Sequence, residues 1–331
     1  MVLVRARAMT NSEEPLVLTS RVRRPAVAVV VSLAVAMPIA FWSGPAAAAT
    51  APARPYDFNG DGHVDLAAGV SSLNVGSVSE AGGVVVLPGT KTGISLSEQF
   101  LTQDTPGVPG APQDRGYLGS SVTSGDFDRD GYADLAVGYE AVILFGSKQG
   151  LTGARSYVLP EGPTTTGALV TADVDGDGWL DLAVGQPDAE RVVVYRGSKA
   201  GFALARSTVL RGKAGSDERF GSALGTGDLD RDGNADLVVG ADGPGFPDDE
   251  GFSGPGSVSA CYGGSGGVRS CTQLVHDLKY AGNQSLVVGN VLGDARPEIV
   301  FGVPDTFLQF GSTTAEKKGR RGGAVEVLTL T

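Results

Sequence analysis

The chain has 331 residues, a hydrophobic content of 41% and a mean hydropathy of +0.04, which exclude a wholly disordered protein. Its formal net charge of −11 excludes nucleic acid and an anionic membrane as the main partner. The 50 glycines, about twice the ordinary usage, favour many tight turns between short strands. The composition therefore predicts an all-β protein.

The N-terminal residues 1–49 have the pattern of an export signal. Three arginines within residues 21–24 precede an uncharged apolar run over 26–41, and small residues that suit a signal peptidase end at Ala49. The alternative is a membrane anchor, but the run is shorter than the roughly 20 residues of a span, and a proline interrupts it. We expect cleavage near Ala49, no stable membrane anchor, and a mature chain of residues 50–331 that is secreted or held at the cell surface.

An acidic segment recurs along the rest of the chain at intervals of about 50 to 70 residues, a spacing typical of repeat architectures. Each copy reads Asp-x-Asp-x-Asp-Gly-x-x-Asp-Leu, with Asn in place of the second Asp in the first copy. The four copies span residues 57–65 (loop 1), 126–134 (loop 2), 173–181 (loop 3) and 228–236 (loop 4), each followed by Leu. A degenerate fifth copy begins at Asn290.

Similar strands surround each acidic segment. A small-residue strand such as Phe220–Leu224 precedes it, and an apolar run that ends in glycine, such as Leu135–Gly138, follows it. Next come a strand that closes in a Gly-Ser turn, such as Val142–Ser147, and a last extended piece, such as Ser207–Leu210. These pieces make about four strands per repeat, which is the content of one propeller blade. No stretch has helical periodicity with capping residues.

The combination of Phe220-Gly221-Ser222, the acidic loops and the Val-Gly close resembles the FG-GAP repeat of the integrin α-chain head and of integrin-like secreted proteins. The resemblance covers residues 55–331 and implies an all-β propeller that binds calcium and acts in binding or adhesion.

The family ring usually has seven blades, whereas this chain has about five. The chain is therefore either a compact five-bladed ring or an open arc. Open edges would favour a homodimer, because unpaired strand edges invite another chain.

The acidic loops have the composition of calcium sites. Calcium takes six to eight oxygen ligands, and glycine at loop position 6 permits the sharp turn that folds both halves of the loop around one ion. Side chains at positions 1, 3, 5 and 9 and the carbonyl at position 7 supply the oxygens. The predicted ligands are Asp57, Asn59, Asp61, His63 and Asp65; Asp126, Asp128, Asp130, Tyr132 and Asp134; Asp173, Asp175, Asp177, Trp179 and Asp181; and Asp228, Asp230, Asp232, Asn234 and Asp236.

Two alternatives to a calcium site fit the loops less well. An EF-hand begins in the same way but needs Glu at position 12 and flanking helices, and here position 12 is Ala or Val. Ion-free Asx turns are the simpler reading, but four Asp in one short loop repel one another unless a cation neutralises them. We therefore predict about four Ca²⁺ ions. The fifth copy has Leu292 at position 3, which offers no side-chain oxygen, and we predict no tight ion there.

The remaining motifs give little chemistry. Cys261 and Cys271 are predicted to form a disulfide across a glycine-rich hairpin, the alternative being two buried thiols. His63 lies in loop 1, and His276 has no partner pattern of a catalytic base. A Gly-x-Ser-x-Gly match over 263–267 lacks the strand-to-helix elbow of a nucleophile.

The sequence therefore predicts a non-enzymatic protein that binds a protein or carbohydrate ligand through rim loops such as 241–256. The alternative is a secreted, calcium-dependent polysaccharide hydrolase or lyase.

Overall fold

The computed structural model describes residues 5–6, 52–159, 167–212, 218–243, 256–278, 285–293, 296–303 and 324–329. Apart from Arg5–Ala6, the predicted signal peptide lies outside these residues, as does most of the 241–256 loop. The described chain is almost entirely antiparallel β-sheet, with two short 3₁₀ turns, η1 (Pro187–Ala189) and η2 (Leu204–Arg206). The all-β prediction is confirmed.

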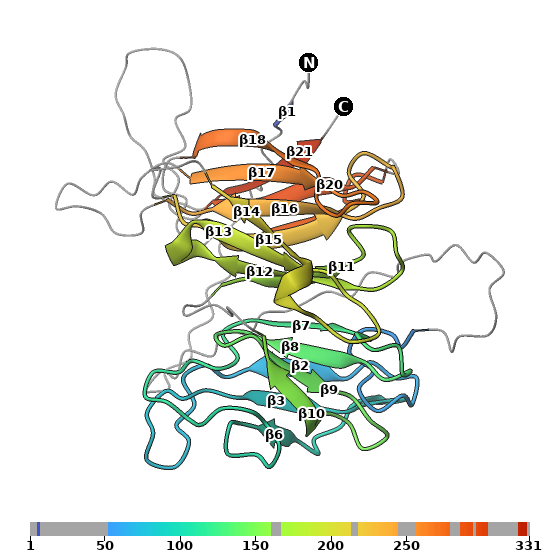
Figure 1. Cartoon of the computed structure of the whole chain (residues 1–331), viewed down its shortest axis with the longest axis vertical. Coiled ribbons are helices and arrows are strands. Elements are labelled where there is room, and N and C mark those ends of the chain that lie inside the picture. The colour runs from blue at the N-terminus through green and yellow to red at the C-terminus, as the bar shows by residue number, and fades with distance from the viewer. Residues whose placement is uncertain are drawn as a thin grey trace, which may run out of the picture.

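The described strands form five sheets of three or four strands, which we call blades 1 to 5 in chain order (Figure 1), and one two-stranded hairpin. Blade 1 contains β2 (Leu66–Gly69), β3 (Val84–Leu87) and β6 (Gln99–Leu101), and a small hairpin, β4 (Gly89–Thr90) with β5 (Gly93–Ile94), follows β3. Blade 2 contains β7 (Val122–Gly125), β8 (Asp134–Val137), β9 (Val142–Phe145) and β10 (Thr152–Val158). Blade 3 contains β11 (Leu169–Ala172), β12 (Asp181–Gln186), β13 (Arg191–Tyr195) and β14 (Ser207–Arg211).

Blade 4 contains β15 (Phe220–Gly227), β16 (Asp236–Ala241), β17 (Gly256–Tyr262) and β18 (Ser270–Leu278). Blade 5 contains β19 (Leu286–Gly289), β20 (Glu298–Val303) and β21 (Ala324–Thr329), and its fourth place is taken by β1 (Arg5–Ala6), which pairs with β21. Four blades thus have the predicted four strands. Because β1 belongs to the predicted signal peptide, cleavage near Ala49 would leave the edge of β21 without this partner.

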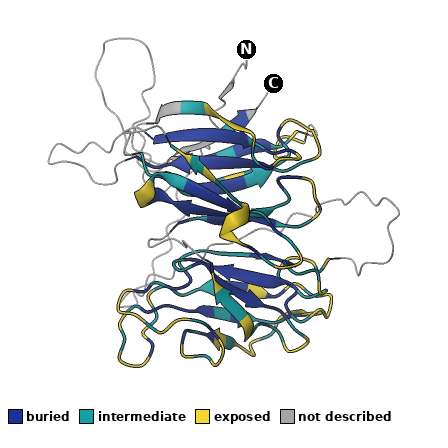
Figure 2. Ribbon diagram, in the orientation of Figure 1, coloured by how far each residue is buried: buried dark blue, intermediate teal, exposed yellow. Residues whose placement is uncertain are grey.

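Alternation along the strands places the core between consecutive blades. In blade 2, Leu135 and Val137 pack toward blade 1, whereas Ala136 and Ile143 pack toward blade 3. Successive residues of a strand point to opposite faces, so a strand that is covered on both sides is apolar at every position. The fully buried run of β8 and β9 shows this in Figure 2. Each of the four hydrophobic clusters joins one blade to the next.

Glycine permits close contact between neighbouring blades. The first strands of the later blades, β7, β11, β15 and β19, lie next to one another along the middle of the molecule. A Cβ on Gly69 would lie 1.8 Å from the carbonyl oxygen of Gly119, and one on Gly185 would lie 2.0 Å from that of Gly221. The glycines that recur after the acidic loops and inside the Phe-Gly-Ser run are therefore contact points at which two backbones meet without side chains between them.

The blades follow one another as an open arc. Blade 1 lies at one end of the long axis and blade 5 at the other (Figure 1), and no hydrophobic cluster of the described residues joins them. Blade 1 has no first strand within the described residues, in agreement with the short segment available before loop 1. Of the two arrangements expected from the sequence, the residues that the structure describes have the open one.

The outer face of blade 1 is apolar and partly exposed. The register pairs Leu66 with Leu87, Ala68 with Val85, and Val85 with Phe100. These five residues point away from blade 2, and Phe100 is 49% exposed. At the far end of the arc, Val287 of blade 5 is 58% exposed. Among the described residues, no helix is long and apolar enough to cross a membrane.

Candidate metal centres

Each acidic loop leads into the second strand of its blade, and in blades 2 to 4 it connects the first and second strands. Loop 1 leads into β2, which has no first strand before it. All four loops have the same local conformation because their side chains cap their own backbones. The glycine at position 6 has a positive φ in every loop, at Gly62, Gly131, Gly178 and Gly233. The predicted turn is therefore present at this position in each of the four loops.

The aspartate at position 1 closes the turn. Asp57 accepts hydrogen bonds from the N–H groups of Asp61 and Gly62, both at 3.0 Å. Asp126 accepts from Asp130 and Gly131, both at 3.1 Å. In loops 3 and 4 the position-6 glycine again donates to the first aspartate. The backbone amides thus orient the carboxylate at position 1 in every loop.

The aspartate at position 9 fastens the loop to the rest of the blade, a role that sequence reasoning missed. In loop 2, Asp134 accepts from the N–H of Phe127 at 2.8 Å and from that of Gly146, beyond β9, at 2.9 Å. The same pair of bonds recurs at the ends of loops 1, 3 and 4. Both oxygens of this carboxylate therefore bind backbone amides, and at least one of them keeps a further lone pair for a cation.

The recurring glycine beyond the third strand is explained by the same contact. A Cβ on Gly146 would lie 2.2 Å from the carbonyl oxygen of Ala133, the residue just before Asp134. Gly89, Gly197 and Gly263 face the carbonyl at the same loop position at 2.1–2.3 Å. The glycine of this turn, which Ser follows in two of the four repeats, therefore indicates the acidic loop that lies against it.

Positions 1, 3 and 9 converge, whereas position 5 does not join them. In three loops the three carboxylates each offer an oxygen, and these oxygens lie within 4.8 Å of one another: Asp126, Asp128 and Asp134; Asp173, Asp175 and Asp181; and Asp228, Asp230 and Asp236. Position 5 instead accepts the N–H of position 7, as Asp177 does from Trp179 at 2.8 Å. In loop 1 the amide oxygen of Asn59 takes the place of the second carboxylate and accepts the N–H of Asp61.

Burial makes these carboxylates costly to keep ionised. It raises the pKa of Asp134 to about 8 and that of Asp181 to about 7, although backbone hydrogen bonds oppose the shift. Burial also raises the pKa of Asp65, Asp126, Asp173 and Asp236. Neighbouring loop carboxylates raise several of them further. A divalent cation would reverse this effect, because it stabilises the ionised form.

Within loops 1 to 4, two buried carboxylate oxygens have no hydrogen-bond donor. They are Oδ1 of Asp128 and Oδ1 of Asp228, at position 3 of loop 2 and position 1 of loop 4. A buried unsatisfied carboxylate oxygen is destabilising, and an ion is one group that satisfies it. The donor set of hard carboxylate and amide oxygens fits Ca²⁺ by its chemistry, and it contains no thiolate that would suit a softer metal.

Consecutive loops touch one another along one side of the arc. The N–H of Ala133 in loop 2 donates to the carbonyl of Asp57 in loop 1 at 3.0 Å, and Ala235 in loop 4 donates in the same way to Asp173 in loop 3 at 3.0 Å. Between loops 2 and 3, the guanidinium of Arg129 lies 4.3 Å from the centre of the Trp179 ring. The four loops therefore form a continuous row.

The degenerate fifth copy keeps only part of this arrangement. Glu298, fully buried at position 9, accepts the N–H groups of Val291 at 2.8 Å and Leu292 at 3.1 Å, and its Oε1 has no donor. Leu292 is exposed. Position 5 of this copy lies outside the described residues. The absence of a tight ion there stays a prediction.

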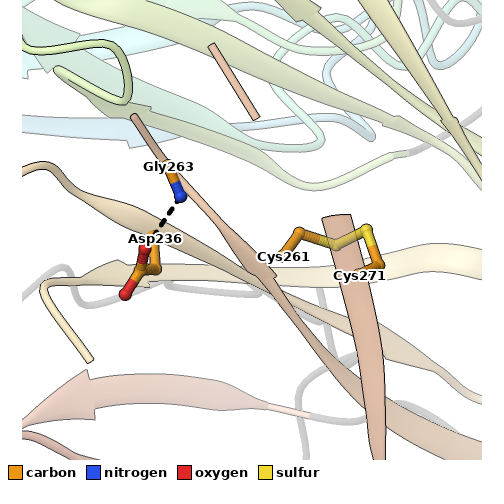
Figure 3. The surroundings of a disulfide bond; sticks show 4 residues. All are labelled: Asp236, Cys261, Gly263 and Cys271. Carbon is orange, nitrogen blue, oxygen red and sulfur yellow. Dashed lines mark hydrogen bonds between the residues drawn. A yellow bond between two sulfur atoms is a disulfide. The ribbon is translucent and has the colours of Figure 1, made fainter. Parts of the chain in front are cut away.

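Cys261 of β17 and Cys271 of β18 form a disulfide between directly opposed positions of blade 4 (Figure 3). Figure 3 also shows Gly263, two residues beyond Cys261, donating to Asp236 at 2.8 Å. The bridge therefore holds the third and fourth strands together, close to the hydrogen bond between Gly263 and Asp236 that fastens loop 4 to the blade. His63 lies within loop 1, and His276 lies on β18.

Sequence-family models match the chain in the blades that carry these loops. The FG-GAP repeat model matches residues 118–151 and 220–260, and the FG-GAP-like repeat model matches residues 173–239. Residues 118–151 and 173–260 carry FG-GAP repeats. The resemblance inferred from the sequence is confirmed for these residues, and the four-stranded sheets of blades 2 to 4 are consistent with FG-GAP propeller blades.

Two curated proteins share part of this FG-GAP region. They are the phosphatidylinositol-glycan-specific phospholipases D of Rattus norvegicus and Bos taurus, each 32% identical over 106 residues. The match covers 28% of this chain and 13% of each relative. The similarity therefore concerns the repeats, and the FG-GAP chain spans a small part of the length of these enzymes.

Proposed function

We propose that the chain is an exported, calcium-stabilised, integrin-like binding protein that holds a protein or carbohydrate ligand on loops at one rim of the arc. The FG-GAP repeats support an integrin-like binding or adhesion protein. The phospholipase D relatives bring no catalytic role to this chain, because the match covers 13% of their length. The binding role rests on a rigid scaffold whose loops are free to vary.

The observation that carries the calcium assignment is the convergence of three carboxylates in each of loops 2, 3 and 4. In loops 2 and 4, one of these carboxylates has a buried oxygen without a donor. Repulsion within each group and burial both oppose the ionised state, and a divalent cation offsets both effects. An empty acidic turn on a protein surface would need neither the burial nor the inward direction of these oxygens.

Calcium would act here as a structural ion. The residues that would hold it are those at positions 1, 3 and 9, and the ion supplies the positive charge that lets these side chains stay ionised. The row formed by the four acidic loops would then become rigid along the arc. Binding would stabilise the folded chain by about 2.7 kcal/mol per site at a hundredfold excess over Kd.

A calcium titration of residues 50–331 by calorimetry, with a melting curve at each point, tests the assignment. We expect binding of about four ions and a rise in Tm. Asp128→Asn should weaken one site by about tenfold or more, because it removes a ligand charge at a buried position. Asp104→Asn, which changes an exposed acid outside the loops, is the control and should bind like wild type. Heat-silent titration together with a Tm that chelator leaves unmoved would overturn the assignment.

The open arc supports a second part of the proposal, which concerns the partner. Blade 1 presents toward solvent the face that blades 2 to 4 place against the preceding blade. We propose that this face is covered by a second copy of the chain, through the outer face of blade 5 that carries the exposed Val287. The test is a measurement of mass in solution and is set out in the Discussion.

A further inference from the structure

An arginine lies against the acidic loop in three of the four repeats. In loop 2, Arg155 of β10 places Nη1 2.6 Å from Oδ2 of Asp128 and Nη2 3.2 Å from Oδ2 of Asp130. In loop 4, Nη2 of Arg269 lies 2.6 Å from Oδ2 of Asp232. The acidic loops and the outer strands of the same blades are therefore joined by ion pairs.

Loop 3 has the most buried of these ion pairs. Arg196, just beyond β13, directs Nε and Nη2 at Oδ2 of Asp175, with Nε at 2.5 Å. The side chain of Asp175 is fully buried, and that of Arg196 is 34% exposed. Asp175 also belongs to the converging group of loop 3. The guanidinium thus contacts one of the carboxylates that a cation would use.

Loop 1 differs from the others. Among the described residues, its carboxylates and Asn59 bond to one another and to backbone amides, and no ion pair with arginine or lysine involves them. Loop 1 is also the copy with one carboxylate fewer. The arginines therefore accompany the three loops with the highest negative charge.

We propose that Arg155, Arg196 and Arg269 are built-in competitors of the cation in loops 2, 3 and 4. This inference rests on the calcium binding proposed above. Each guanidinium neutralises part of the loop charge when no ion is present, and so stabilises the ion-free fold. The ion has to displace that guanidinium, or bind beside its positive charge, and either event weakens binding. The affinity of these loops is consequently lower than their carboxylate count alone would give.

Loop 3 permits a site-specific test because Trp179 is the one tryptophan of residues 50–331 and occupies position 7 of that loop. Tb³⁺ bound there should be sensitised by Trp179, and Ca²⁺ should displace it. We expect Arg196→Gln to raise the Ca²⁺ affinity measured by this competition by about tenfold or more. The same variant should melt at a lower temperature than wild type in chelator, and the difference should shrink at saturating Ca²⁺.

Arg211→Gln is the matched control. Arg211 is exposed on β14 of the same blade, opposite Arg191, at the end far from loop 3. It should leave the terbium signal, the calcium affinity and the ion-free Tm unchanged. If Arg196→Gln does not fold without ions, Arg155→Gln replaces it, because the Arg155 side chain is 57% exposed. Its effect on loop 2 is then measured as a tighter calcium-binding event in calorimetry.

The outcomes separate this inference from the proposed function. Absence of any Tb³⁺ or Ca²⁺ binding in wild type would overturn the calcium assignment, and the inference with it. Calcium binding in wild type with equal or weaker binding in Arg196→Gln and Arg155→Gln would overturn the inference alone, and would make these arginines simple loop supports.

Discussion

At the level of single residues, some positions of the repeat motif are required by close backbone contacts and others by the proposed metal ligands. The aspartate at position 9 binds two backbone amides, and the glycine that supplies one of them faces a loop carbonyl too closely for any side chain. The acidic loop and the Gly-Ser turn, which are far apart in sequence, are therefore parts of one structural unit.

Replacing Gly146 by Ala tests this contact. The added Cβ would lie 2.2 Å from the carbonyl oxygen of Ala133, so either loop 2 or the end of β9 has to move. We expect a loss of about 1–3 kcal/mol in the free energy of unfolding, measured by urea denaturation. Gly266→Ala is the control, because its Cβ would meet no atom within 4 Å. Equal midpoints for the two variants would contradict the steric reading.

The raised pKa values predict how stability depends on pH. The pKa of Asp134 is about 8 and that of Asp181 about 7 in the ion-free fold, above the ordinary value of 3.8. A carboxyl with a raised folded-state pKa contributes stability that is complete below its unfolded pKa and is lost as pH rises through the folded value. In chelator, the Tm should therefore fall between about pH 4 and pH 8. Saturating Ca²⁺ should remove this fall. A chelated protein whose Tm rises over that window would contradict the assignment of these buried acids.

At the scale of elements, the sequence was sufficient for the strands and the turns but not for the contacts between them. The periodic acidic loops and their glycines predicted four turns, and all four are present. Position 5 was predicted as a ligand, whereas its carboxylate caps the turn in the ion-free fold. The arginines at the loops were not predicted, because Arg155 and Arg269 are more than twenty residues from the carboxylates they contact, and no local pattern connects them.

The disulfide in blade 4 gives a prediction at this scale. Cys261 and Cys271 close a hairpin next to the hydrogen bond from Gly263 to Asp236. Replacing both by Ser should lower the free energy of unfolding by about 2–3 kcal/mol, because the unfolded chain gains freedom. Urea denaturation of the double variant under oxidising conditions measures the loss. A wild-type protein that loses the same amount on reduction would assign the effect to the bridge and not to the new side chains.

In the molecule as a whole, no described residue covers the outer face of blade 1, and Val287 is 58% exposed on blade 5 at the other end of the arc. The outer face of blade 1 combines Phe100, Leu66 and Val85. Interior blades bury the equivalent face against a neighbouring blade. Blade 1 is built from the same repeat, which explains why its outer face is apolar although no described residue covers it. The repeats predicted about five blades, as the structure has, but closure could not be predicted from them, because each repeat specifies only its contact with the next.

Self-association should depend on that face. We expect the mass of residues 50–331 from light scattering to rise with concentration, and Phe100→Asp to keep the chain monomeric. Leu96→Asp is the control, because Leu96 is 91% exposed but lies outside the strands of blade 1. A wild-type protein that stays monomeric up to about 100 μM would exclude a dimer in the affinity range of ordinary interfaces.

The four clusters between consecutive blades also determine how the molecule can change in length. A closed ring fixes the number of its blades, since one blade more or fewer breaks two contacts and changes every angle. In the arc, each blade meets only its neighbours, as in a one-dimensional array. Gain or loss of a terminal blade changes a single interface. The same scaffold can therefore lengthen or shorten by whole repeats while the acidic loops that remain keep their row.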